Sequence, residues 1–131
     1  MSFNFKGQSA IEFVILIMAV LFLFAGLLYF IHGKIATTKA EAVTVAVNEI
    51  SITVQDEINL DHSSANGYSR QFFLPPNLNG FDYTAQIIDR SVYVRTDNGK
   101  NAVALPVLNV TGDILIGNNL IYKSEGIVYL N

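Results

Sequence analysis

Two different hydrophobic patterns divide the chain. Residues 13–31 contain no charged side chain and are almost entirely apolar. At the helical rise of about 1.5 Å per residue, this run would be roughly 28 Å long, which is close to the hydrocarbon thickness of a bilayer. The first pattern therefore predicts a helix that is long enough to cross a membrane.

Apolar side chains continue at helical spacing beyond this run. They recur every third or fourth residue and form one stripe, with most charged and amide side chains elsewhere on the helix: Ala36, Ala40, Val43, Val47, Ile50, Val54 and Ile58. The many Val and Thr residues lower helix propensity, so tertiary packing has to stabilise this half. Residues 61–67 are a polar cluster that is typical of a loop. We therefore predict one helix over residues 8–62.

Residues 63–131 show short apolar runs separated by turn residues, which is the pattern of β-strands. Hairpin turns are expected at residues 89–90, at residues 97–100, where Asn98 and Gly99 would need positive φ, and at residues 117–119. No second helix is visible. We predict an α+β fold in which one small antiparallel sheet covers the striped half of the helix.

Several aromatic residues of the strand region could either fill the core or form a binding surface. For most of them we expect packing against the helix, because large aromatic side chains dominate core energetics. The residues concerned are Phe72, Phe73, Tyr83, Tyr93, Tyr122 and Tyr129.

Composition narrows the possible classes of protein. The chain has 131 residues, which suits one domain with an extension. Hydrophobic residues make up 51% and charged residues only 15%, as expected for a membrane-associated protein. The net charge of −3 provides no basic surface for nucleic acid. Cysteine is absent, which excludes disulfides and thiol chemistry.

A short motif precedes the apolar run. Lys6, Gly7 and Gln8 are followed by Ser9, and one carboxylate, Glu12, stands at the start of the membrane-length helix. This arrangement resembles the processing site of archaeal type IV pilin-like proteins with a class III signal peptide. The resemblance implies that a prepilin peptidase cuts between Gly7 and Gln8, so that residues 1–7 are a leader. Unlike the cleavage site of a secretory signal peptide, Gly7 lies before the apolar run, which would stay on the mature protein.

The resemblance implies a structural subunit without enzymatic activity. Its partners would be further copies of the chain in a helical filament, the prepilin peptidase, an assembly ATPase and a membrane platform protein. The chain would lie in the cytoplasmic membrane before assembly and in a cell-surface filament for adhesion afterwards. The alternative is an uncleaved, membrane-anchored extracytoplasmic binding module that does not polymerise.

Glu12 would be the fifth mature residue, where the resemblance places the glutamate of type IV pilins. A carboxylate in lipid is costly unless a partner offsets its charge. We expect Glu12 of one subunit to pair with the new α-amine of Gln8 on a neighbour, which would set the register between subunits. If Gln8 cyclises to pyroglutamate, the cation is lost, and Glu12 would need donors such as Ser9 or would stay protonated.

Two glycines, Gly26 and Gly33, lie within the predicted helix, where each costs about 1 kcal/mol relative to alanine. They could permit the close approach of a neighbouring membrane helix. Alternatively, the helix could bend or melt near Gly33 when subunits leave the membrane.

Other candidate chemistry is sparse. His32 and His62 lie too far apart along the helix to share a metal ion. Asn109 begins an Asn-Val-Thr glycosylation sequon. Four aspartates stand beside turn residues, where their backbone hydrogen bonds explain them better than calcium does: Asp82, Asp89, Asp97 and Asp113. We therefore expect no metal site, no cofactor and no catalytic residue.

Overall fold

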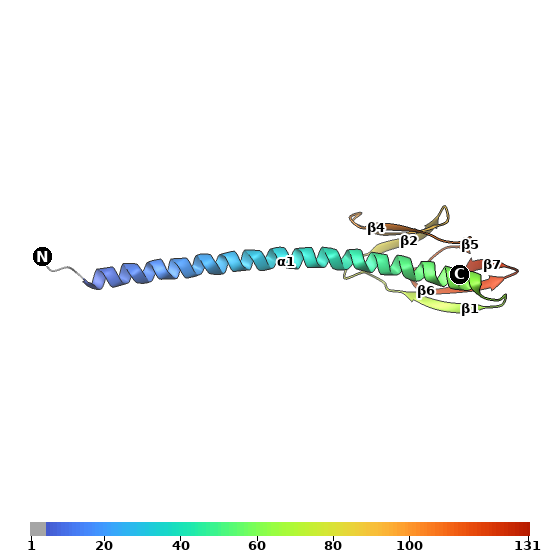
Figure 1. Cartoon of the computed structure of the whole chain (residues 1–131), viewed down its shortest axis with the longest axis horizontal. Helices are drawn as coiled ribbons and strands as arrows, with labels where there is room; N and C mark the ends of the chain where they lie inside the picture. Colours follow the sequence, from blue (N-terminus) through green and yellow to red (C-terminus); the bar gives the residue numbers. More distant parts are fainter. Residues whose placement is uncertain (1–4) are drawn as a thin grey trace. The chain divides into compact units, whose positions relative to one another are not determined.

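The computed structural model describes residues 5–131, which divide into two compact units, a first unit that ends at Lys39 and a second unit, Ala40–Asn131. Helix α1, Phe5–Ser63, runs from the first unit into the second (Figure 1). Its end lies one residue beyond the predicted limit, and its start lies before Gln8. The first four residues of the expected leader are outside the described residues.

Seven strands follow α1 and belong to the second unit (Figure 1). A four-stranded sheet has the order β1-β6-β7-β5, and a three-stranded sheet has the order β2-β3-β4. The fold is therefore α+β, as predicted. The strands are β1 (Ser69–Leu74), β2 (Tyr83–Ile88), β3 (Ser91–Thr96), β4 (Ala102–Pro106), β5 (Val110–Gly112), β6 (Gly117–Ser124) and β7 (Ile127–Leu130).

The prediction of a single antiparallel sheet was wrong. The strands form two sheets, and β5 pairs with β7 in parallel. This pairing depends on Gly112, whose φ is +112° and whose Cβ, if it had one, would lie 1.9 Å from the carbonyl oxygen of Leu130. Only glycine allows the two backbones to come this close, because every other residue carries a Cβ.

The hairpin between β2 and β3 was predicted correctly. Asp89 and Arg90 have φ angles of 48° and 60°, as a two-residue type I′ turn requires. In the turn between β3 and β4, Gly99 has a positive φ of 69°, whereas Asn98 is not among the residues with positive φ. Instead, the Asn98 Oδ1 atom accepts a hydrogen bond from the backbone N–H of Lys100.

The turn expected at residues 117–119 was wrong, because these residues begin β6. The side chain of Asn119 is buried and forms hydrogen bonds with both backbone groups of Leu115. Residues 113–116, which the hydrophobic pattern had suggested were a strand, are therefore bonded to this side chain and do not form a strand. A hydrogen bond from a single buried amide does not produce a periodic pattern in the sequence, so the pattern could not reveal it.

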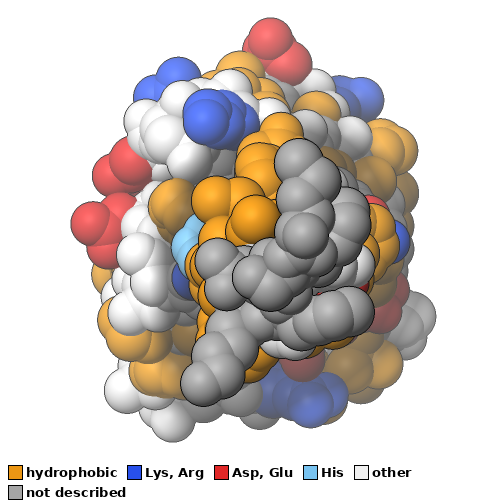
Figure 2. All heavy atoms as spheres, turned by 90° about the vertical axis from the view of Figure 1, so that its left-hand side faces the viewer, with side chains coloured by type: hydrophobic (Ala, Val, Ile, Leu, Met, Phe, Trp, Pro, Cys, Tyr) orange, Lys and Arg blue, Asp and Glu red, His pale blue; other side chains and the backbone are white. Residues whose placement is uncertain are grey.

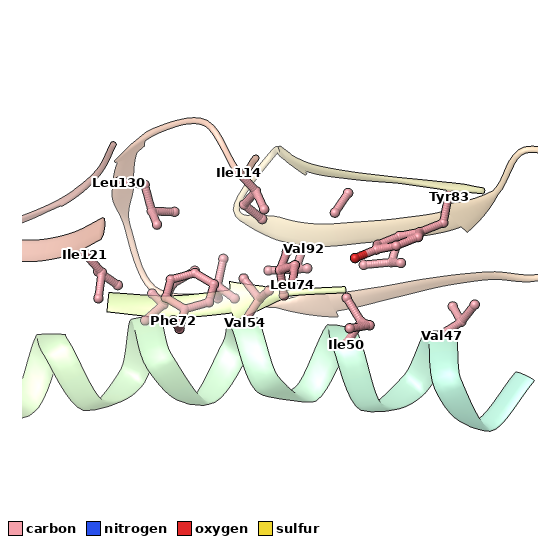
Figure 3. Close-up of a cluster of buried hydrophobic side chains, with 14 of the residues drawn as sticks. Val47, Ile50, Val54, Phe72, Leu74, Tyr83, Val92, Ile114, Ile121 and Leu130 are labelled. Carbon is pink, nitrogen blue, oxygen red and sulfur yellow. The ribbon is translucent and has the colours of Figure 1, made fainter. Parts of the chain in front are cut away.

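The hydrophobic core lies between the second half of α1 and the strands (Figure 3). The stripe was predicted correctly from Val43 to Ile58, and its two earlier members, Ala36 and Ala40, are exposed. Figure 3 shows Val47, Ile50 and Val54 pointing from the helix towards side chains of the strands. Full burial of such a side chain contributes about 1.5–3 kcal/mol, so this face stabilises the β-branched half of the helix.

The aromatic residues divide between core and surface. Phe72 and Tyr83 are buried, as expected, and the Tyr83 hydroxyl donates a 2.7 Å hydrogen bond to the carbonyl oxygen of Pro75. Phe73 is 59% exposed, and Tyr122 stacks on Tyr129 with ring centroids 5.2 Å apart. Tyr93, Tyr122 and Tyr129 are half-buried. Core packing was thus the correct prediction only for part of this set.

The last turn of α1 contains a buried carboxylate. Asp61 continues the apolar stripe and is fully buried, and neither of its side-chain oxygens has a hydrogen-bond partner among residues 5–131. Burial raises its pKa above the ordinary value, and the charges of Lys123 and His62 partly oppose this shift. The Lys123 ammonium also donates hydrogen bonds of 2.7 and 2.9 Å to the carbonyls of His62 and Ser64.

Candidate functional site

The apolar half of α1 is uncovered. The helix is long and apolar enough to cross a membrane by length and composition, and none of its most apolar stretch is buried within the chain. Large hydrophobic side chains such as Phe22 and Tyr29 are 81% and 85% exposed. Figure 2, which faces the left-hand side of Figure 1, shows exposed hydrophobic side chains, in orange, near the centre of the view. The first unit therefore has a surface that is poorly suited to water.

Glu12 lies one helical turn after Gln8 on the same face of α1. The Gln8 Nε2 atom donates a hydrogen bond to Glu12 Oε1 at 3.4 Å, and both side chains are exposed. Side chains four residues apart are neighbours on a helix, so this contact follows from the spacing alone. It was not foreseen by the sequence analysis, which had assigned the amine of Gln8 on a neighbouring subunit as the partner.

Both residues at the predicted cleavage position, Gly7 and Gln8, are exposed. Gly7 is exposed, and a Cβ added to it would meet nothing within 4 Å. Its bond to Gln8 lies inside α1. The side chain of Lys6 lies outside the described part of the structure.

The apolar segment ends at a basic side chain. The Lys34 ammonium lies 5.8 Å from the ring centroid of Phe30, a cation–π distance. One turn later, the Thr37 and Thr38 hydroxyls donate hydrogen bonds to the Lys34 carbonyl oxygen, both at 2.9 Å. Helix α1 is continuous through both Gly26 and Gly33, and open space surrounds both glycines. A neighbouring helix could therefore approach here without a steric clash.

Comparisons with known proteins return no match. No family model, curated protein or solved structure matches the sequence.

Of the remaining candidates, the structure brings His62 and Asn109 together. The His62 Nε2 atom lies 2.6 Å from the carbonyl oxygen of Asn109, a hydrogen bond when this nitrogen carries the proton. Asn109 is exposed in the loop between β4 and β5. Between residues 5 and 131, no group of three or more His, Cys, Asp or Glu side chains could hold a metal ion.

A groove beside β2 was missed by the sequence analysis. Its volume is about 550 Å³, and it is lined by residues 83–87 of β2 and by residues 113–116. The two walls are brought together by tertiary structure, because one belongs to the three-stranded sheet and the other follows β5 of the four-stranded sheet. No local sequence signal could have identified it.

Proposed function

We propose that the chain is a pilin-like structural subunit that polymerises through its apolar N-terminal helix into a cell-surface filament. The observation that carries this proposal is the uncovered apolar half of α1 directly behind Lys6, Gly7, Gln8 and Glu12. An α+β arrangement, in which the second half of the helix packs on a small β-domain, agrees with a pilin-like architecture.

An uncovered apolar helix needs a non-aqueous environment. Hydrophobic burial is worth about 25 cal/mol per Å² of apolar surface. In this proposal the cytoplasmic membrane covers residues 13–31 first, and the helices of neighbouring subunits replace the lipid after assembly. Packing of these helices then provides most of the cohesion, and the open space at Gly26 and Gly33 favours close contact.

In this proposal, Glu12 sets the axial register between neighbouring subunits. Its contact with Gln8 at 3.4 Å is longer than the usual 2.7–3.2 Å of an N–H···O hydrogen bond, so it offsets little of the cost of a charge in lipid. Cleavage after Gly7 would create an α-amine on Gln8 that is cationic below a pKa of about 7.7–8.0. Pairing of this amine with Glu12 of a neighbour neutralises both charges and selects one axial offset between subunits.

The first test is the mass of the N-terminus in material sheared from the cell surface. A high-molecular-weight fraction whose chains begin at Gln8 supports both processing and assembly. The same spectrum detects pyroglutamate as the loss of one ammonia. Chains that keep residues 1–7 and occur only in membranes would contradict the proposal and leave the anchored binding module in its place.

The second test replaces the carboxylate. Glu12→Gln keeps the size of the side chain and removes its charge, so we expect membrane insertion at the normal level and loss of most surface filaments. Glu49→Gln is the matched control, since Glu49 is exposed in the second unit and should leave filament yield unchanged. Normal filaments from Glu12→Gln would refute the register role of Glu12.

A further inference from the structure

The four-stranded sheet has one face in the core and one face in solvent. Phe72 of β1, Ile121 of β6 and Leu130 of β7 belong to the core (Figure 3). Side chains alternate between the two faces of a strand, so the residues next to these three lie on the outer face. Within the four strands, no outer-face position is charged. The large outer-face side chains are all exposed or half-buried, and they are Phe73, Leu120, Tyr122, Ile127 and Tyr129.

Two tyrosines stand side by side at the centre of this outer face. Tyr122 and Tyr129 are cross-strand partners, and their rings stack with centroids 5.2 Å apart and planes 15° apart. One face of each ring is therefore covered by the other ring. On the far side of Tyr129 lies Thr111 of β5, and on the far side of Tyr122 lies Ser69 of β1. Both of these residues are small and exposed, so the second face of each ring is open.

The glycosylation sequon lies at the edge of the same outer face. Its threonine is Thr111, the direct neighbour of Tyr129 in the pair of β5 and β7. Val110, between the two sequon residues, packs against the core, so Asn109 and Thr111 lie on the opposite side of the chain. Asn109 is exposed, and its side-chain amide has no hydrogen-bond partner among residues 5–131. The acceptor nitrogen of the sequon is therefore accessible for modification.

The distance between Asn109 and Tyr129 suits one sugar residue. Two strand rises of about 3.3 Å and one strand spacing of about 4.8 Å separate their Cα atoms by about 8 Å. An asparagine side chain followed by a pyranose ring is long enough to cross this distance. The His62 ring holds the Asn109 carbonyl oxygen at 2.6 Å, and Gly112 lies against the Leu130 backbone. These two contacts fix β5, and with it the acceptor residue, relative to the tyrosine ring.

We propose that Asn109 carries a neutral glycan whose first sugar packs on the open face of Tyr129. The C–H hydrogens of a sugar ring carry partial positive charge and an aromatic face carries partial negative charge, so the two attract each other. An acidic sugar would find no cation on the outer face of these strands, which favours a neutral one. The glycan would also cover part of an apolar surface that water otherwise contacts. This inference requires only that the second unit lies outside the cytoplasm, as it would in the filament subunit and in the anchored binding module alike.

The modification needs one co-reactant, an oligosaccharide that is linked through phosphate to a polyprenyl lipid. Asn109 Nδ2 forms a bond to the anomeric carbon of the first sugar, and the bond from that carbon to the phosphate oxygen breaks. The lipid phosphate leaves with the electron pair of the broken bond, and the amide nitrogen loses one proton. The hydroxyl of Thr111 completes the acceptor sequence, which requires Ser or Thr at this position.

The first test is the mass of the peptide that contains Asn109, in chains isolated from the cells that produce them. We expect an increase equal to whole neutral sugar residues, located on Asn109. Thr111→Val should abolish the increase, because valine keeps the shape of threonine without its hydroxyl, and Thr111→Ser, the matched control, should keep it. An unmodified Asn109 would overturn the inference, and in chains that begin at Gln8 it would leave the filament proposal intact. A modified Asn109 in chains that keep residues 1–7 would support the inference and contradict the filament.

The second test asks whether the glycan contacts Tyr129, in the full chain in detergent micelles. We expect nuclear Overhauser effects between the Tyr129 ring and the first sugar, whose protons should also shift upfield. Relative to Asn109→Gln, the glycan should lower the equilibrium constant of unfolding about twofold to tenfold, the strength of an aromatic contact. Tyr129→Leu should remove this difference, whereas Tyr93→Leu, at a half-buried tyrosine of the other sheet, should keep it.

Three results would overturn the contact between glycan and ring. The first is an equal effect of the glycan on unfolding with and without the Tyr129→Leu substitution. The second is the absence of Overhauser effects between sugar and ring, which is measured without any variant. The third is nitration of Tyr129 in Thr111→Val that decreases as the protein concentration rises, because a second copy of the chain would then cover this face.

Discussion

At the scale of single residues, Asp61 stands out because it is an ionisable group in a position that the helical stripe reserves for an apolar side chain. Its side chain is fully buried, and no hydrogen bond from residues 5–131 reaches either carboxylate oxygen. Glu57, one turn earlier, has instead an ion pair of 3.5 Å with Arg70. Burial without a hydrogen-bond partner disfavours the charged form, so Asp61 destabilises the fold when it is ionised.

Asp61→Asn should raise the free energy of unfolding at neutral pH by about 1 kcal/mol, because a neutral amide costs less to bury than a carboxylate. The pKa of Asp61 is raised above 3.8 in the folded chain. The folded chain thus binds more protons than the unfolded chain between 3.8 and the raised pKa, and stability falls as the pH rises through this window. The gain from Asp61→Asn should therefore disappear below pH 3.8. Urea unfolding of both chains at a series of pH values measures this difference in the free energy of unfolding. A gain that persists in acid would contradict this explanation.

Gly112 is the second residue whose identity is dictated by its surroundings. Gly112→Ala should destabilise the fold by about 2 kcal/mol or more, because the new Cβ would collide with the Leu130 backbone and separate β5 from β7. Gly67→Ala is the control, since Gly67 also has positive φ but open space around it. Comparing the thermal unfolding of the two variants separates the effect of the collision from the effect of backbone strain. Equal losses of stability would show that backbone strain alone is responsible.

At the scale of elements, the C-terminal end of α1 depends on a strand for its cap. The last carbonyls of a helix lack intrahelical partners and carry partial negative charge, so a cation there is stabilising. Lys123 of β6 supplies this cation through its bonds to His62 and Ser64. The helix is thus fixed to the sheet by polar contacts at this end and by the apolar stripe along its length.

Lys123→Met should lower the free energy of unfolding by about 1–2 kcal/mol, since two charge-assisted hydrogen bonds are lost while the aliphatic part is kept. Lys100→Met, in the exposed turn after β3, serves as the control and should change little. In the Asp61→Asn background the loss should be smaller, because the attraction between Lys123 and Asp61 has already been removed. Additive effects in this double-mutant cycle would exclude that coupling.

At the scale of the whole molecule, the second unit contains the hydrophobic core, whereas the apolar half of α1 in the first unit is exposed. The buried hydrophobic core begins at Val43, inside the second unit, Ala40–Asn131. The first unit contributes no buried hydrophobic residue in the part of the chain that is described. This division agrees with the proposed function, in which the second unit folds by itself and the apolar half of α1 is covered by lipid or by other subunits.

A fragment of residues 40–131 should therefore be monomeric in water and unfold cooperatively, because it retains the complete core. Circular dichroism during urea unfolding and analytical ultracentrifugation measure these properties. The full chain without detergent should self-associate under the same conditions, since its apolar helix remains uncovered. A fragment without a cooperative transition would show that the first unit is needed for folding.

The sequence alone determined the features that depend on local periodicity. The stripe from Val43 to Ile58, the membrane-length apolar run and the hairpin at Asp89 and Arg90 were all predicted from spacing and turn chemistry. The motif from Lys6 to Glu12 was likewise found by sequence, and its role remains a proposal. These features were accessible because each arises from interactions between residues that are close along the chain.

Only the tertiary structure decided which distant segments meet. The division into two sheets, the parallel pair of β5 and β7, the burial of Asp61 and the groove beside β2 all join residues that are far apart in sequence. Asn119 illustrates the reason: in the sequence it belongs to a Gly-Asn-Asn turn signal, but its buried amide takes the place of a strand partner for Leu115. Local propensity is weaker than the requirement that buried backbone groups be hydrogen-bonded, and that requirement is met only in three dimensions.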